Sequence, residues 1–169
     1  MRANSATANA LAFFSASSDP YYQIRVEPAH PDAAAFLVTW REHTHSRDVV
    51  IGKDIPSRPF ARFLGNLMIA ETIDDDTDCR IRLAGSSLRQ RYKREVSGRR
   101  LSELFSPPIA ADNLARLRKV RETGGAFIHA AAVMPDVAPP LYYEVLLLRA
   151  LAPNETAMWN IIGIFTFAS

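Results

Sequence analysis

Cysteine is nearly absent from this chain, because Cys79 is the single one among 169 residues. It has no partner for an internal disulfide bond, which excludes a secreted disulfide framework. One cysteine and four histidines also supply too few ligands for the usual four-ligand structural zinc site. Long hydrophobic runs are missing too, since no window approaches the ~20 apolar residues of a transmembrane helix. The fold must therefore depend on an ordinary hydrophobic core.

An excess of either charge is also lacking. Twenty basic and 18 acidic residues give a net charge of +2 at pH 7, so the overall charge indicates no partner. Apolar residues make up 48% of the chain and charged residues 22%, as is typical of a globular protein. A domain of this length buries roughly two-thirds of the surface that its unfolded chain exposes. Only residue patterns can therefore indicate the function.

The first residues offer little to a core. Residues 1–20 are mainly small and polar, and the apolar stretch 10–14 is too short for the hydrophobic region of a signal peptide. Small polar side chains bury too little surface to offset the entropy of ordering them. We therefore predict a flexible leader over residues 1–30, a single domain over residues 31–169 and a cytoplasmic location.

A helix with one apolar stripe is predicted at about residues 31–45. Ala33, Phe36, Leu37 and Trp40 recur there at helical spacing. The stripe can pack in one of two ways, either against a sheet of the same chain or against the same helix of a second chain. We favour the second alternative, a homodimer interface that contains Phe36, Leu37 and Trp40.

A β-hairpin is predicted next. Residues 67–73 form an apolar run, residues 74–77 an acidic turn, and residues 78–84 alternate between apolar and basic side chains. Two strands joined by so short a turn pair antiparallel. Gly85 ends the second strand, and a short helix over residues 88–92 is expected to follow.

The second half of the chain predicts one long helix and three strands. Ser106 and Pro107 have the form of an N-cap and a first helical residue, and Gly124 has the form of a C-cap, which places a helix over residues 107–123. Three apolar runs follow, separated by turn residues that are too few for a crossover helix, so neighbouring strands should pair antiparallel. These runs are residues 126–134, 141–151 and 157–167.

The order of these elements and several short motifs resemble a family of short bacterial PAS-like proteins. The motifs are RLAGS at residues 82–86, GRRL at 98–101, Trp40 with PSR at 56–58, and EVLLL at 144–148. The family resembled here has a proline after the last of these motifs, where this chain has Arg149 and Ala150. The resemblance covers about residues 34–167.

The resemblance implies an α+β fold, with a PAS-like five-stranded antiparallel sheet, helices on one face and an extra N-terminal helix. It also implies a non-catalytic sensory module that binds a small molecule or a signalling protein and acts through dimer or partner contacts. Such domains hold a ligand between the sheet and the longest helix, here residues 107–123. Arg82 is a further candidate, because a guanidinium matches the geometry of an anionic group. The candidate ligand-binding residues are His129, Tyr142, Tyr143, Glu144, Trp159, Asn160 and Arg82.

No cofactor, metal or catalytic residue is predicted. A flavin-adduct domain resembling this fold has a cysteine in the helical insertion, whereas Cys79 lies on a strand, and a haem sensor has a histidine on the long helix, where residues 107–123 contain none. Paired catalytic carboxylates and a nucleophile with its base are not recognisable either. Glu71 and Glu144 each interrupt an apolar strand. Each has two possible interpretations, a polar anchor in a pocket or a solvated carboxylate on the outer face.

The alternative function is a nucleic-acid-associated regulator. The segment 80–100 contains eight basic side chains against one acidic residue, Glu95, and such a density suits phosphate binding. No recognition helix or RNA-binding motif accompanies it, and the acidic segment 71–78 lies beside it. A solvated or partner-binding face is therefore favoured. The expected partners are a small molecule, a signalling protein and a second copy of the chain, while nucleic acid and membrane are disfavoured.

Overall fold

The computed structural model describes residues 22–92, 95–133 and 141–167. Its centre is a six-stranded antiparallel sheet with the strand order β1-β4-β5-β6-β2-β3. The strands are β1 (Gln23–Arg25), β2 (Leu67–Ile73), β3 (Asp78–Ala84), β4 (Phe127–Val133), β5 (Leu141–Leu151) and β6 (Met158–Thr166).

The sheet has one strand more than the sequence predicts. Strand β1 lies within residues 1–30, for which the sequence predicts a flexible leader, yet it pairs with β4 at the edge of the sheet. The prediction is wrong for this strand because its three residues are too few to stand out from a polar segment. Residues 1–21 of the predicted leader lie outside the described residues.

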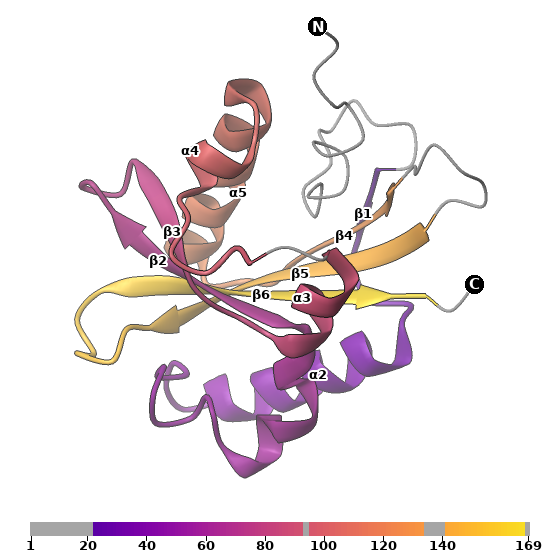
Figure 1. Cartoon of the computed structure of the whole chain (residues 1–169). Helices are drawn as coiled ribbons and strands as arrows, with labels where there is room; N and C mark the ends of the chain where they lie inside the picture. Colours follow the sequence, from indigo (N-terminus) through magenta and orange to yellow (C-terminus); the bar gives the residue numbers. More distant parts are fainter. Residues whose placement is uncertain (1–21, 93–94, 134–140, 168–169) are drawn as a thin grey trace, which may run out of the picture.

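Helices cover both faces of the sheet (Figure 1). They are α2 (Pro31–Thr44), the 3-10 helix η1 (Arg58–Asn66), α3 (Ser86–Tyr92), α4 (Leu101–Leu104) and α5 (Pro107–Thr123). The predicted C-cap of α5 is confirmed, since Gly124 has a φ of 74° and its N–H donates to the carbonyl of Val120. Ser106 precedes the helix as predicted, but its side chain forms no capping hydrogen bond.

None of the helices in the described ranges is long and apolar enough to cross a membrane.

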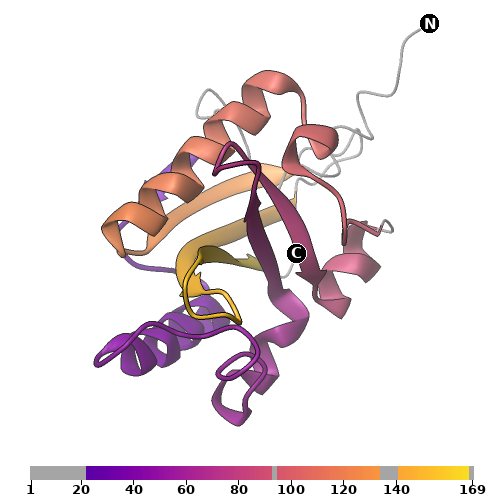
Figure 2. The same cartoon turned by 90° about the vertical axis from the view of Figure 1, so that its left-hand side faces the viewer.

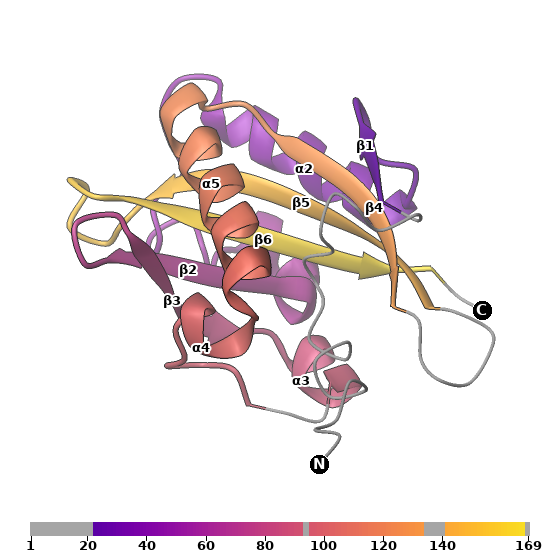
Figure 3. The same ribbon diagram turned by 90° about the horizontal axis from the view of Figure 1, so that it is seen from above.

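Two hydrophobic cores share the sheet, one on each face. Helices α4 and α5 cover one face and α2 with η1 covers the other, as the views in Figures 2 and 3 show. Strands β5 and β6 send alternate side chains into both cores: Tyr143 and Leu147 pack toward α5, while Leu146 and Leu148 pack toward α2. The predicted α+β fold with an extra N-terminal helix is confirmed, and this helix covers the face of the sheet opposite to α5.

The apolar stripe of α2 is buried within the chain. Phe36 is 0% exposed, Leu37 1% and Trp40 5%. Phe36 packs against the rings of Phe60 and Phe63 in η1, and the three side chains belong to the α2-side core. Of the two alternatives, packing against the sheet of the same chain is therefore the observed one. This corrects the predicted dimer interface, because these side chains face their own sheet.

Candidate functional site

The six strand residues expected to line one pocket point to both faces of the sheet. Side chains alternate along a strand, so adjacent residues such as Tyr142 and Tyr143 belong to opposite faces. On the α5 side lie His129, Tyr143 and Asn160. On the α2 side lie Tyr142, Glu144 and Trp159. The predicted pocket beneath residues 107–123 is corrected by this division, which places the sheet itself between the two groups.

Arg82 belongs to neither group. It is on β3, which forms the edge of the sheet opposite to β1. Its guanidinium lies 3.6 Å from the carboxylate of Glu71. The guanidinium of Arg80 lies 3.9 Å from the same carboxylate. The prediction that Arg82 shares a pocket with the strand residues is therefore corrected: it pairs with Glu71 on the surface of the hairpin.

A polar cluster occupies the space between α5 and the sheet. The Nη1 group of Arg121 donates to Oδ1 of Asn160 at 2.5 Å, and its Nη2 group pairs with Asp76. The amide nitrogen of Asn160 donates to the backbone carbonyls of Leu117 and Leu148 at 3.2 and 3.3 Å. Both Asn160 and Arg121 are buried. This cluster joins α5, β6 and the β2–β3 turn, so its geometry is that of a structural contact.

Cys79 lies beside this cluster. Its sulfur lies 3.8 Å from the Nη1 atom of Arg121 and is fully buried. Burial raises the pKa of the thiol to about 11, although the nearby arginine opposes this shift. The thiol therefore stays protonated at neutral pH. In the described ranges of the chain, no group of three or more His, Cys, Asp or Glu side chains is placed to hold a metal ion.

Glu144 is a buried anchor on the α2 side. Its carboxylate is 0% exposed and accepts hydrogen bonds from the backbone N–H groups of Ala29 and His30, both at 2.8 Å. Its Oε2 atom also lies 3.3 Å from Nε of Arg25. Because Ala29 and His30 directly precede α2, Glu144 ties the start of that helix to the sheet. The polar-anchor interpretation of this residue therefore fits the structure.

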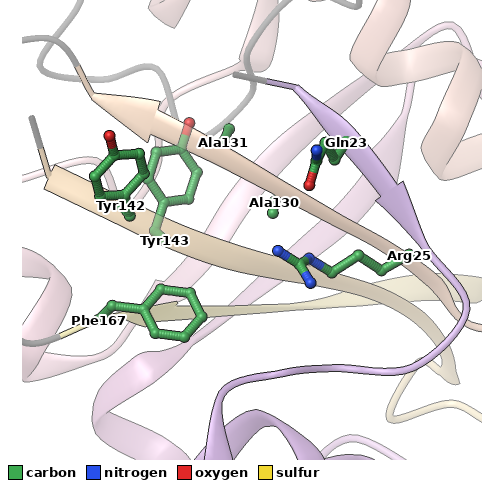
Figure 4. A pocket seen from close by; sticks show the side chains of 7 residues that line it. All are labelled: Gln23, Arg25, Ala130, Ala131, Tyr142, Tyr143 and Phe167. Atoms are coloured by element: carbon green, nitrogen blue, oxygen red, sulfur yellow. The ribbon is translucent and has the colours of Figure 1, made fainter.

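A cavity of about 480 Å³ opens beside Glu144, at the edge of the sheet. Strand β1 contributes Gln23 and Arg25, and Ala130 lies on the neighbouring strand β4. Figure 4 shows that the guanidinium of Arg25 extends from β1 across the floor of the cavity, toward the aromatic side chains opposite. The complete lining is Gln23, Arg25, Ala130, Ala131, Tyr142, Tyr143 and Phe167.

This edge cavity contains two of the predicted ligand residues and several that the sequence analysis missed. Tyr142 and Tyr143 line it, whereas Glu144 lies behind Arg25. The missed lining residues are Gln23, Arg25, Ala130, Ala131 and Phe167, and the first two were missed because they lie in the predicted leader. Polar and apolar side chains alternate over residues 23–26, but four residues are too few for this pattern to identify a strand.

The described arginines of the basic segment 80–100 each lie beside a carboxylate. Exposed pairs of this kind contribute little stability, but they reduce the positive potential that a nucleic-acid site needs. The side chains of residues 91, 93 and 94 lie outside the described part of the segment. The described ion pairs are Arg80 and Arg82 with Glu71, Arg89 with Glu95, Arg99 with Glu103, and Arg100 with Asp74.

Comparison with known families agrees with the fold. No curated protein and no solved structure matches the chain significantly. The sequence profile described as PAS domain matches residues 29–166, which is most of the chain. The five strands β2 to β6 and the helices between them lie within that match. The chain therefore belongs to the PAS domain family, whose members are generally sensory and signalling modules rather than catalysts.

Proposed function

We propose that this PAS domain is a non-catalytic sensor that binds a small molecule in the edge cavity. The observation that supports this most directly is the cavity itself. Its volume of about 480 Å³ lies in the range of small-molecule sites. It combines aromatic walls with polar groups from one strand, Gln23 and Arg25, as ligand pockets do. The space between α5 and the sheet, in contrast, contains the Arg121–Asn160 cluster.

Strand β1 is a suitable element to pass on the state of the cavity. Gln23 and Arg25 face the cavity, while Ile24 is 68% and the following Val26 89% exposed. The same segment leads to α2, whose start is tied to Glu144. A ligand that moves β1 would therefore change an exposed apolar surface as well as the start of a helix. We propose that this surface contacts a signalling partner or a second copy of the chain.

A search for the ligand with a blocked cavity tests the proposal. Small molecules released from the purified full chain are identified by mass spectrometry, and a metabolite library is screened for compounds that raise Tm. Ala130→Phe fills the cavity, because Ala130 is nearly buried in its lining, whereas Ala111→Phe adds the same side chain at an exposed position of α5. Wild type and Ala111→Phe should bind the same compound, and Ala130→Phe should not.

Ligand binding is compared only among variants that are folded. Far-UV circular dichroism checks each variant, and Ala130→Leu replaces Ala130→Phe if the larger side chain prevents folding. A compound that binds equally well to the blocked variant would contradict the proposed site. The absence of both a released molecule and a stabilising compound would contradict the proposed function.

A further inference from the structure

We propose that the edge cavity selects a small monocarboxylate with an apolar body. The inference rests on the proposed function and names the chemical class of its ligand. Among the described residues that line the cavity, Arg25 is the only charged one. Its side chain is 34% exposed, so solvent and ligands can reach it. A guanidinium binds a carboxylate through paired, charge-assisted hydrogen bonds, which fixes the orientation of the ligand as well as its charge.

Glu144 leaves Arg25 able to bind a second anion. The carboxylate of Glu144 accepts two backbone N–H groups at 2.8 Å, so most of its hydrogen bonding is supplied by the segment before α2. Arg25 approaches it through Nε at 3.3 Å. No hydrogen bond joins the two terminal nitrogens of Arg25 to a described residue, and Figure 4 shows them directed into the cavity. The pair with Glu144 therefore positions Arg25 without using its paired donors.

The other lining residues define the rest of the ligand. Gln23 points into the cavity from the same strand as Arg25, and its amide can donate to one carboxylate oxygen (Figure 4). Tyr142, Phe167 and Ala130 supply an apolar surface for an aromatic or short aliphatic body. A phosphate group, which carries more negative charge, fits less well, because the cavity has one cation and Glu144 lies directly behind it.

Binding of matched acids and amides tests the ligand class. Benzoate and hexanoate are titrated into the full chain by isothermal calorimetry beside benzamide and hexanamide, which keep the shape but lose the charge. Each acid should bind about tenfold more tightly than its amide, since a hydrogen bond to a charged group is worth about one power of ten in affinity. Arg25→Gln should remove this preference, because it lowers the affinity for the acid more than the affinity for the amide.

Two further variants make the result specific to Arg25. Arg41→Gln removes another arginine from an ion pair, that with the exposed Glu27, and should leave the preference intact. Arg25→Lys keeps the charge but lacks the paired donors and should retain only part of it. Circular dichroism and Tm confirm that each variant is folded.

The outcomes separate the ligand class from the site. Equal affinities for acid and amide, both lost in Ala130→Phe, would overturn the carboxylate class and support the cavity. A preference for the acid that survives in Arg25→Gln would also overturn it. If neither acids nor amides bind while another compound binds in a way that Ala130→Phe abolishes, the class is wrong and the proposed function stands. Probes that bind equally to Ala130→Phe contradict both.

Discussion

Arg121 and Arg118 contact the same carboxylate from different environments, and this contrast allows their energies to be compared. Both pair with Asp76, but the side chain of Arg121 is 7% exposed and that of Arg118 49%. Arg121 also donates to the buried Oδ1 of Asn160. A buried acceptor that loses its charged donor costs its full desolvation energy, whereas an exposed ion pair contributes little.

Arg121→Met should therefore lower the free energy of unfolding by about 2 to 3 kcal/mol, since it leaves Oδ1 of Asn160 without this donor. Arg118→Met is the matched control and should lower it by less than about 1 kcal/mol, because it removes only exposed contacts with Asp76, namely one ion pair and one hydrogen bond to the backbone carbonyl. Urea denaturation followed by circular dichroism measures both changes. Equal losses in the two variants would show that the buried contact to Asn160 adds no stability.

The burial of Arg121 shows how far sequence reasoning reaches at the level of single residues. The helix over residues 107–123 is predicted correctly, but its sequence pattern does not indicate that one of its arginines is buried. Arg121 follows Leu117 by one helical turn and therefore lies on the core stripe. Charge alone suggests a surface position, and only the polar partner from β6 makes burial acceptable. That partner is distant in sequence, so no local pattern indicates it.

At the scale of elements, Gly85 joins the hairpin to the 3-10 helix η1. It follows β3, and its N–H donates to the carbonyl of Leu67 at the start of β2. A Cβ atom added to Gly85 would lie 2.3 Å from the backbone oxygens of Gly65 and Leu64. The glycine of the RLAGS motif is thus required by the close approach of two backbones, which have no flexible side chain to move aside.

Gly85→Ala should therefore lower the free energy of unfolding by about 3 kcal/mol, because it forces apart η1 and the end of β3. Gly125→Ala should change it by less than about 0.5 kcal/mol, because a Cβ atom at Gly125 meets nothing within 4 Å. Both glycines lie just outside regular elements, which makes the pair a fair comparison. Denaturation midpoints in urea give the result, and a tolerated Gly85→Ala would disprove the packing argument.

The elements that the sequence predicts well are those with many local signals. The hairpin strands have the predicted bounds, since residues 67–73 and 78–84 are long runs of regular pattern around an acidic turn. Asp74, Asp75 and Asp76 all have positive φ angles there, which aspartate tolerates better than most residues. Strand β1 and helix η1 were missed, because a three-residue strand and a 3-10 helix carry almost no periodic pattern.

At the scale of the whole molecule, the question the sequence left open was what covers the second face of the sheet. The apolar stripe of α2 fits either a dimer or the sheet of its own chain. The deciding signal lies in another element: residues 145–148 of β5 are apolar without alternation, as in strands buried on both faces. The site could not be predicted in the same way, because the edge cavity requires β1, β4 and β5 to meet across distant parts of the sequence.

The shared sheet also predicts that the two cores unfold together. Both tryptophans, Trp40 and Trp159, pack on the α2 side, whereas Leu117 is fully buried on the α5 side. Leu117→Ala should lower the free energy of unfolding by about 2 to 5 kcal/mol. The substitution should shift the midpoint of the urea transition equally in tryptophan fluorescence and in far-UV circular dichroism. This holds although both tryptophans belong to the α2-side core.

The physical reason is that β5 and β6 belong to both cores, so neither layer can lose its packing while the strands keep the other intact. Leu37→Ala on the α2 side is the matched variant, because Leu37 is equally buried and should produce the same coincidence of transitions. A fluorescence transition of Leu117→Ala that stays at the wild-type midpoint, while the circular dichroism transition moves, would show that α5 and its core unfold independently of α2.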